Sequence, residues 1–520
     1  MGEFMKRLLV AVAAFGAFGE SVALAAVALA APFRDGAVLQ RGVPVCVWGE
    51  AGPREKIEVS FAGKTASATA DAKGAWKAFL PPLEASAVGR PLKAAGTDGE
   101  VTVSDVLVGE VWIASGQSNM EMPLWGGSNR FRDAEGAVLS QYVRCPAIRF
   151  FRTSCYKWSA TPTNGTDAVW EAVTPETVRE FSAVAYFFAD ELHRALGVPV
   201  GVLSAHWGGT GIDAWTPREG YDLHPELEEG RFPVTAQWKK EMAKGSISSA
   251  CQQPTVIYNR LVAPFVPYTA KGVIWYQGEH NVTHDSETYG LKLRAYLDGM
   301  RKVFANPSLR LYLAQIAVFD YERLDKSSGK QAKMVRLQME QEKFAASEPG
   351  AGIAILTDVL SVDDVHPRSK RCVAQRLALQ ALKKDYGFDV VCDSPVFRSA
   401  KLLDDGTVEL AFEGETKGGW YMYNDNRSTE LSFELQDKEG EWHPARLVNI
   451  HRPTGIWDAK TGVVAGEKLV VGWRDDGQVF APKAVRYMHS APWKGALYTN
   501  AGLPIGPFSA AARTSSSAWR

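Results

Sequence analysis

The sequence predicts an α/β protein in which a doubly wound parallel sheet is flanked by an N-terminal and a C-terminal β-sandwich-like domain. Short strands separated by Gly, Pro and Asp turns occupy residues 38–106. Apolar strands alternate with amphipathic helices over residues 107–386, and a strand pattern returns over 391–508. Because strand–helix alternation is typical of a parallel sheet covered on both faces, we expect that sheet in the middle region.

The composition excludes several classes of protein. The chain has 520 residues, with 58 Lys and Arg against 59 Asp and Glu, which gives a formal charge of −1. This balance offers no electrostatic attraction for nucleic acid or for an anionic membrane surface. Six cysteines are too few for a disulfide scaffold of this length. We therefore expect a soluble, strand-rich protein of about three domains, and the composition by itself indicates no reaction.

Residues 1–31 have the pattern of a secretory signal peptide. A basic pair at 6–7 precedes an apolar run over 8–18, and a small-x-small pattern ends at Ala25 or at Ala30. Glu20 interrupts the apolar stretch, which argues against a stable membrane span. We predict export to the periplasm or the cell exterior, with an uncleaved anchor as the alternative.

Two strand-rich regions flank the middle of the chain. In the first, residues 32–106, the segments 45–48, 56–61 and 75–79 alternate or run apolar between turn residues. In the second, residues 387–510, the segments 407–412, 430–435, 468–473 and 484–488 do the same. Each region is predicted to be a separate β-domain.

The middle region, residues 107–386, is predicted to be the α/β domain, and the candidate catalytic residues described next all lie in it. Its helix over 181–196 ends before Gly197, and its last helix, over 369–384, follows Pro367. The expected strands are short apolar runs at 111–114, 200–204, 272–276, 311–318 and 352–356.

Ser118 is the candidate nucleophile. It follows the predicted strand 111–114, and ligands of open α/β sheets bind beyond the carboxyl ends of the strands. The segment is not a Gly-x-Ser-x-Gly elbow, because Met120 stands where the second Gly should be.

The next two strands are followed by candidate oxyanion donors. Gly208, Gly209 and Gly211 follow the strand 200–204, and glycines allow backbone N–H groups to approach a ligand closely. Gln277 and Asn281 follow the strand 272–276, and either side-chain amide can donate to an oxyanion. His280 and His284 have the i, i+4 spacing of a zincin motif, but the Glu of that motif is absent between them, so no metal site is predicted there.

The base is expected at His366. A carboxylate at Asp363 or Asp364 would orient the imidazole through Nδ1, which leaves Nε2 to take a proton from a hydroxyl. Spacing favours Asp363, Asp364 is the close second, and a Ser–His dyad helped by a backbone carbonyl is the third alternative.

In the order Ser, Gly, Gln/Asn and Asp-His, these segments resemble the four blocks of the SGNH hydrolase superfamily, and most closely its sialate O-acetylesterase family. The residues that carry the resemblance are Gly116-Gln-Ser-Asn-Met120, Ser204 to Thr210 with Ala214-Trp-Thr-Pro217, Ile274 to Asn281, and Asp364-Val-His-Pro367. One departure is His280, which replaces the Ser usual in the third block.

The resemblance implies an SGNH-type doubly wound sheet and a serine esterase that removes acetyl groups from sugars, most of all 9-O-acetylated sialic acids. Ser118 would attack, His366 would act as base, and Asp363 or Asp364 would orient it. The oxyanion would be held by the N–H groups of Ser118 and Gly209 and by Gln277 or Asn281. No metal or organic cofactor is expected.

Four side chains near these blocks are predicted to contact the sugar. Trp125 and Trp215 offer aromatic faces for stacking, and Glu279 and His280 are polar residues of the third block. A sialate carboxylate would favour an arginine, and the arginines nearest the motifs in sequence are Arg130, Arg218 and Arg260.

Two other functions stay open. An acetylxylan or other polysaccharide deacetylase would use the same mechanism on another sugar. A carbohydrate-binding protein without catalysis is less favoured, because a binding module has no use for an activated serine. A peptidase or lipase is disfavoured, because the second block lacks lipase features and no apolar surface helix adjoins it.

Overall fold

The structure is a computed structural model. It describes residues 27–97, 99–125, 132–153, 156–227, 251–323, 329–359, 364–416, 419–423, 432–451, 461–464, 468–473, 481–490 and 496–514. Most of the predicted signal peptide, residues 1–26, lies outside these ranges, as do Arg130 and Asp363. Within them, every helix is too short or too polar to cross a lipid bilayer.

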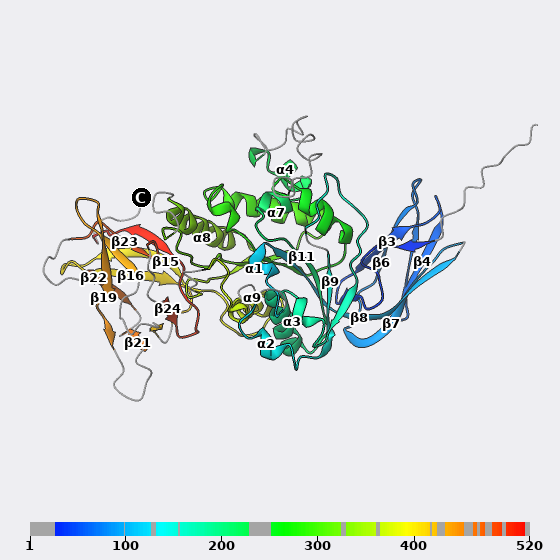
Figure 1. Cartoon of the computed structure of the whole chain (residues 1–520), viewed down its shortest axis with the longest axis horizontal. Helices are drawn as coiled ribbons and strands as arrows, with labels where there is room; N and C mark the ends of the chain where they lie inside the picture. Colours follow the sequence, from blue (N-terminus) through cyan, green and yellow to red (C-terminus); the bar gives the residue numbers. More distant parts are fainter. Residues whose placement is uncertain are drawn as a thin grey trace, which may run out of the picture.

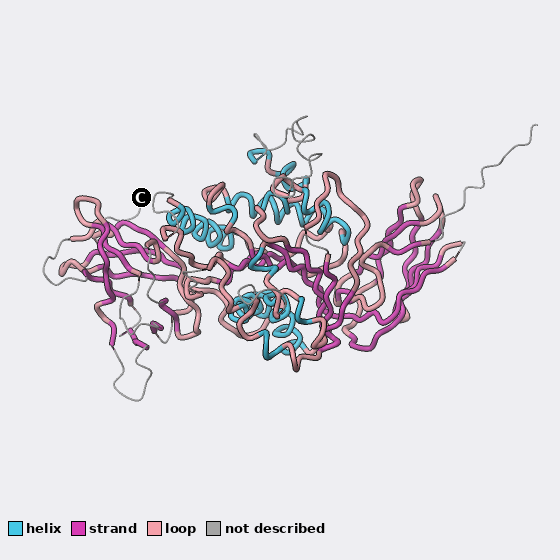
Figure 2. Tube along the Cα trace, in the orientation of Figure 1, coloured by secondary structure: helices cyan, strands magenta, loops and turns pink. Residues whose placement is uncertain are grey.

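Three parts of the chain lie in a row along the long axis (Figure 1). The N-terminal strands form one end, the C-terminal strands form the other, and helices are concentrated in the middle (Figure 2). The middle part therefore carries the mixed α/β layers, and the two ends consist of strands and loops.

The N-terminal strands belong to two sheets. One sheet has the order β1-β3-β6, and the others join the large central sheet through β8. Ala28 pairs with Glu50, so the end of the predicted signal segment is part of a strand. The bounds are β1 (Ala28–Leu29), β2 (Val38–Gln40), β3 (Val45–Glu50), β4 (Lys56–Phe61), β5 (Lys64–Thr69), β6 (Ala75–Leu80), β7 (Ser86–Ala95) and β8 (Glu100–Gly116).

Strand β8 joins the N-terminal part to the middle part. It is 17 residues long, and the predicted domain boundary at 106/107 falls inside it. Its first half pairs antiparallel with β7, and Leu107 to Gly109 pair with β2. Its second half pairs in parallel with two central strands, β11 and β12. One strand therefore runs from the N-terminal part to the turn that precedes Ser118.

The central strands have the order β10-β9-β11-β8-β12-β13-β14. All neighbours on this path are parallel except β10 and β9, and the prediction of an α/β fold is confirmed. The bounds are β9 (Cys145–Arg152), β10 (Trp170–Val173), β11 (Val200–His206), β12 (Gly272–Tyr276), β13 (Arg310–Ala314) and β14 (Ala351–Ala354).

Helices cover both faces of this sheet (Figure 1). Because side chains alternate along a strand, Trp112 of β8 packs in the core that contains α3 and α9, whereas Val111 and Ile113 pack in the core that contains α7 and α8. The bounds are α1 (Ser118–Glu121), α2 (Gly136–Leu139), α3 (Ala183–Leu196), α4 (Arg218–Leu223), α7 (Tyr289–Val303), α8 (Lys330–Ser347) and α9 (Lys370–Lys384).

The predicted helix 181–196 is observed as α3, with end signals that explain its length. The Ser182 hydroxyl accepts the N–H of Ala185 at 3.2 Å and caps the start. Gly197 has a φ of 67° and ends the helix in the left-handed conformation that glycine adopts without strain.

The C-terminal strands form a seven-stranded antiparallel sheet, β15-β16-β22-β19-β18-β23-β25, and a four-stranded one, β20-β21-β17-β24. The Thr357 hydroxyl donates to the carbonyl of Ile505 at 2.7 Å, which ties this part to the end of β14. The bounds are β15 (Val396–Leu402), β16 (Val408–Glu413), β17 (Trp420–Tyr423), β18 (Phe433–Gln436), β19 (Trp442–Leu447), β20 (Ile450–His451), β21 (Thr461–Val464), β22 (Leu469–Trp473), β23 (Ala484–Tyr487), β24 (Ala496–Thr499) and β25 (Phe508–Ala511).

Candidate active site

The end of β8 turns sharply and presents Ser118 at the carboxyl edge of the sheet. Gly116 has a φ of +143°, and a Cβ there would lie 2.2 Å from the carbonyl oxygen of Tyr276. Only glycine allows this approach between β8 and β12. The Gln117 N–H donates to the same carbonyl at 3.0 Å, and Ser118 then begins helix α1.

Ser118, His366 and Asp364 form a hydrogen-bonded relay. His366 Nε2 lies 2.8 Å from Ser118 Oγ, and His366 Nδ1 lies 3.0 Å from Asp364 Oδ1. The same carboxylate oxygen accepts the backbone N–H of His366 at 2.9 Å. The imidazole is 26% exposed, so the relay is open to solvent. Of the two carboxylates predicted for orientation, Asp364 is the one in contact, and Asp363 lies outside the described residues.

The glycine turn after β11 packs directly on the serine. A Cβ at Gly208 would lie 3.2 Å from Ser118 Cβ. The Gly208 N–H donates to Glu121 Oε2 at 2.5 Å, which anchors the turn to α1. Gly209 follows with a φ of +73°, a conformation that glycine adopts readily.

Gln277 lies behind this turn and is fully buried. Its Nε2 lies within 3.1 Å of oxygens of Gln117, Thr210 and Asn281, and its Oε1 accepts the Tyr289 hydroxyl at 2.6 Å. Since both amide hydrogens point at protein oxygens, the prediction that Gln277 donates to an oxyanion does not fit this geometry.

Asn281, the other predicted amide donor, has a fixed orientation. Its Oδ1 accepts the Gln277 amide at 2.8 Å and the Ile212 N–H at 3.2 Å. The Nδ2 group therefore points away from these two donors. The side chain lies beside the glycine turn, with Nδ2 at 3.7 Å from the position of a Cβ on Gly211.

A buried polar chain joins the serine helix to the histidine loop. The Asn119 amide donates to Glu279 Oε1 at 2.5 Å and to the Val365 carbonyl at 3.0 Å. Its Oδ1 accepts Lys370 Nζ at 2.5 Å, and that ammonium lies 5.0 Å from the centre of the Tyr276 ring. One amide thus connects three segments of the site.

Burial shifts the pKa at both ends of this chain. It lowers the pKa of Lys370 to about 7, although Glu279 and Asp133 act in the opposite direction. Burial also raises the pKa of Glu279 above its usual range. Glu279 was predicted to contact substrate; its side chain is half-buried, and its Oε1 accepts the Asn119 amide, so substrate contact stays a prediction.

The aromatic candidates differ in exposure. Trp215 is fully buried, donates to Thr210 Oγ1 at 2.9 Å and packs edge-on against Trp275, so the prediction that it stacks on a sugar is wrong. Trp125 is half-buried, and the guanidinium of Arg132 lies 3.6 Å from the centre of its ring.

His280 lies at the edge of the third block, in the 3-10 helix η6 (His280–Val282). Its ring stacks on that of His284, with centroids 4.8 Å apart. Burial, and then the neighbouring His284, lower the pKa of His280. The ring is half-buried and keeps a surface toward the glycine turn, where it contacts the position of Gly211.

Four residues of the site were missed by sequence reasoning. Their signals are weak: Asn119 and Glu121 follow the serine on a helical turn, and Lys370 follows the histidine by four positions. Tyr156, whose hydroxyl donates to Glu121 Oε1 at 2.7 Å, stands in no motif. The i, i+3 spacing of Ser118 and Glu121 is the one pattern that places one of these four side chains on the same helix face as Ser118.

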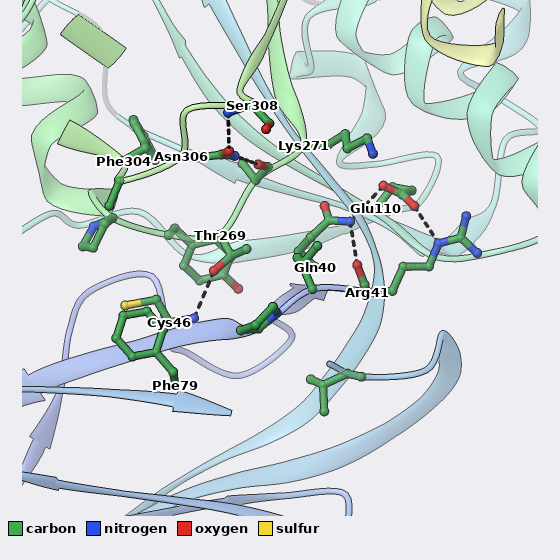
Figure 3. Close-up of a pocket in the computed structure, with 18 of the residues that line it drawn as sticks. Gln40, Arg41, Cys46, Phe79, Glu110, Thr269, Lys271, Phe304, Asn306 and Ser308 are labelled. Carbon is green, nitrogen blue, oxygen red and sulfur yellow. Dashed lines mark hydrogen bonds and ion pairs between the residues drawn. The ribbon is translucent and has the colours of Figure 1, made fainter. Parts of the chain in front are cut away.

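The cavity in Figure 3 lies at the opposite edge of the sheet. It measures about 670 Å³ and is lined by Arg41, Glu110, Lys271 and Arg310, among others (Figure 3). These residues lie at or before the amino ends of the central strands, or midway along β8, and Glu110 is roughly 20 Å from the end of β8. No predicted site residue lines the cavity, and ligands of such sheets bind at the other edge.

Metal-ligating side chains are sparse in the part of the chain that the structure describes. No group of three or more His, Cys, Asp or Glu side chains lies there in an arrangement able to hold a metal ion. The prediction that catalysis needs no metal stays a prediction.

A serine, a histidine and an aspartate in contact at the carboxyl edge of a parallel sheet define the site as that of a serine hydrolase on an α/β fold. The model of the family "carbohydrate esterase, sialic acid-specific acetylesterase" matches residues 108–383. The chain belongs to this family.

Known relatives agree with this membership. A carbohydrate acetylesterase from Xanthomonas citri superimposes with a TM-score of 0.77 at 33% identity, over 93% of this chain and 99% of that one. The human sialate O-acetylesterase is 26% identical over 66% of this chain, and the match spans 66% of the human protein's length. The rat sialate O-acetylesterase is 25% identical over 80% of this chain and 79% of its own.

Proposed function

We propose that this protein is a serine esterase that removes O-acetyl groups from sugars, most of all from 9-O-acetylated sialic acids. The observation that carries the proposal is the Ser118–His366–Asp364 relay, which has the contacts of an activated nucleophile, its base and the orienting acid. The family description and the names of the relatives supply the substrate class.

In the acylation step, His366 Nε2 takes the proton of Ser118 as Oγ bonds to the acetyl carbonyl carbon. The carbonyl π-electrons move to oxygen and form a tetrahedral oxyanion. When this intermediate collapses, the C–O bond to the sugar breaks, and His366 gives its proton to the departing sugar oxygen. The products are a free sugar hydroxyl and acetyl-Ser118.

In the deacylation step, water replaces the sugar. His366 Nε2 takes a proton from water as its oxygen bonds to the acetyl carbon, and the second intermediate collapses to release acetate. The proton on His366 returns to Ser118 Oγ. Asp364 stabilises the imidazolium that forms in both steps, and it holds the ring with Nε2 toward the serine.

We assign the oxyanion contacts to the N–H groups of Ser118 and Gly209 and to Asn281 Nδ2. The packing of Gly208 on Ser118 supports the two backbone donors. The fixed orientation of Asn281 supports the third, since its Oδ1 is already paired. Gln277 acts indirectly by holding Asn281. Each donor of this kind contributes roughly 3 kcal/mol to the barrier reduction.

One described arginine supports an acidic sugar as substrate. Arg132 covers one face of Trp125, and its buried Nε has no hydrogen-bond partner among the described residues. A sialate carboxylate would supply an acceptor for this guanidinium. The arginines expected from sequence are less suitable, because Arg218 pairs with Asp222 and Arg260 donates to the Gly165 carbonyl.

A neutral acetylated polysaccharide is the second candidate substrate. It is favoured by the similarity to a protein described only as a carbohydrate acetylesterase. Acetate release from 9-O-acetylated sialic acid, acetylated xylan and acetylated pectin fragments ranks the candidates. The proposal expects the highest kcat/KM on the sialic acid, and a preference for xylan would replace the substrate and keep the mechanism.

The Ser118→Ala variant tests the mechanism. Hydrolysis of p-nitrophenyl acetate and of the sugar substrate is expected to fall by at least about 10³-fold, because the nucleophile is lost. Binding of the sugar, measured by calorimetry, should persist. Turnover close to wild type in a correctly folded variant would overturn the proposed function.

We also propose that the chain is exported and that it has the doubly wound catalytic domain of the SGNH superfamily between two β-sandwich-like domains. The pairing of Ala28 with Glu50 supports cleavage of the signal after Ala25 in preference to Ala30, because the later cut would remove β1. N-terminal sequencing of the exported protein distinguishes the two positions.

A further inference from the structure

We propose that Tyr156 is a substrate-binding residue whose ring receives the sugar of the acetylated substrate. The inference rests on the proposed esterase function and deepens it, since it names a residue that selects the alcohol part of the ester. Neither the four sequence blocks nor the relay includes this residue, which lies in the loop that follows β9.

Hydrogen bonds connect Tyr156 to the nucleophile's surroundings. Its hydroxyl donates to Glu121 Oε1 at 2.7 Å, and Glu121 Oε2 accepts the Gly208 N–H at 2.5 Å. Glu121 ends the single-turn helix that Ser118 begins, and Gly208 packs on Ser118 Cβ. The phenol is therefore two hydrogen bonds from the turn that contacts the serine.

The ring of Tyr156 is held in place from one side. It meets Trp207 edge-on, with centroids 5.6 Å apart and planes at 73°. Trp207 is itself buried, and its N–H donates to the Gly116 carbonyl at 3.1 Å. Because β8 and β11 fix Trp207, they also fix the Tyr156 ring relative to Ser118.

Tyr156 remains 57% exposed in spite of these contacts. Its backbone has a φ of 60°, a left-handed conformation that costs energy for a residue with a large side chain. A strained backbone that presents an exposed aromatic ring beside a nucleophile is typical of a ligand-contacting position.

The chemistry of such a surface matches a pyranose. The face of an aromatic ring packs against the C–H groups of a sugar, and the hydroxyls around the sugar remain free to hydrogen-bond. With the acetyl group at Ser118, the sugar must lie outside the relay, and the exposed ring of Tyr156 offers it an aromatic surface. The buried Trp215 cannot serve this purpose.

Steady-state kinetics on two substrates test the proposal. One substrate is the best acetylated sugar of the panel, and the other is ethyl acetate, which has the same acyl group and no ring. For Tyr156→Ala we expect kcat/KM on the sugar to fall about 10- to 30-fold, mainly through KM, and to fall at least ten times less on ethyl acetate. Tyr156→Phe, which keeps the ring, should stay within about threefold of wild type on both.

Tyr142 supplies the matched control, because it is 78% exposed and contacts none of the site residues described above. Tyr142→Ala should leave both substrates unchanged. Equal losses on sugar and ester for Tyr156→Ala would overturn the proposal in favour of a role in holding Glu121, and an unchanged KM for the sugar would overturn it outright. Failure of the esterase assignment is seen separately, as ethyl acetate hydrolysis that survives Ser118→Ala.

Discussion

At the scale of single residues, the imidazole of His366 is fixed by one carboxylate oxygen that makes two contacts. Asp364 Oδ1 accepts both the ring Nδ1–H and the backbone N–H of His366. The two contacts close a small loop, so the carboxylate cannot turn away without losing both hydrogen bonds. Asp364 thereby sets which ring nitrogen faces Ser118.

Asp364→Asn is expected to lower kcat by about 10²- to 10⁴-fold, because an amide favours the wrong tautomer and no longer stabilises the imidazolium. KM for the sugar should change little. Steady-state kinetics on p-nitrophenyl acetate and the sugar measure both parameters.

Asp363→Asn is the comparison that separates the two neighbouring carboxylates. The contact of Asp364 with the ring predicts the larger loss for Asp364→Asn. The opposite ranking would contradict the assignment and return the orienting role to Asp363.

Residue identity in the site was predictable where the chemistry restricts the choice. Ser118, His366 and a nearby carboxylate stood out because few residue types perform nucleophilic and basic steps. The roles of Trp215 and Gln277 were not predictable, because burial and hydrogen-bond partners depend on neighbours far apart in the sequence. Lys370 and Asn119 are 251 positions apart, and no local pattern links them.

At the scale of secondary structure, the serine depends on how closely β8 and β12 approach at their ends. The close approach of Gly116 to the Tyr276 carbonyl determines where the chain leaves β8 and where α1 begins. Any side chain at position 116 would separate the two strands or move Ser118 away from His366.

Gly116→Ala should therefore cost about 2–4 kcal/mol of unfolding free energy, through steric overlap and positive φ together, and should abolish most activity. Urea unfolding followed by tryptophan fluorescence measures the stability, and ester hydrolysis at low denaturant measures the function.

Gly63→Ala is the matched control. Gly63 also has a positive φ, of 76°, but nothing lies within 4 Å of a Cβ there. Its substitution should cost only about 1 kcal/mol and leave activity intact. Equal costs for the two variants would show that the close approach at Gly116 has no energetic importance.

Five strands and two helices of the middle region were predicted, because apolar runs and cap residues are local signals, whereas β9, β10, α7 and α8 were not. The length of β8 was not predicted either. Residues 100–106 alternate, as in a strand with one exposed face, and residues 107–116 are continuously buried. The change in burial pattern suggested a domain boundary at 106/107. The strand hydrogen bonds of β8 continue across this point, first with β7 and β2 and then with β11 and β12.

At the scale of the whole molecule, the C-terminal part docks on helix α8 through a carboxylate. A Cβ at Gly506 would lie 2.2 Å from Glu342 Oε1, and that oxygen accepts the Gln315 amide at 2.6 Å. Desolvation in this contact raises the pKa of Glu342 to about 8.

A carboxyl with a raised pKa in the folded state stabilises the fold at low pH, and this contribution is lost as pH rises from about 4.5 to about 8. Relative to Glu342→Gln, the unfolding free energy of the wild type should therefore fall by about 1–2 kcal/mol between pH 5 and pH 9. This value is reduced because the side chain is partly exposed. Thermal unfolding at the two pH values measures the difference.

Glu439→Gln serves as the control, because the Glu439 side chain is 60% exposed and lies far from this contact in sequence. It should shift the melting temperature equally at both pH values. If the melting temperatures of the wild type and of Glu342→Gln changed equally with pH, the ionised Glu342 carboxylate would not destabilise the docking contact.

The seventeen-residue strand β8 also constrains how this enzyme can be recombined in evolution or by design. A gene fusion cut at residue 107 would leave a half-strand whose β2 and β7 partners are gone, directly upstream of Ser118. The N-terminal strands that pair with β8 therefore cannot be exchanged independently of the middle part. The smallest transferable segment that keeps the pairing of β8 begins at β2, the first strand along the chain that pairs with it.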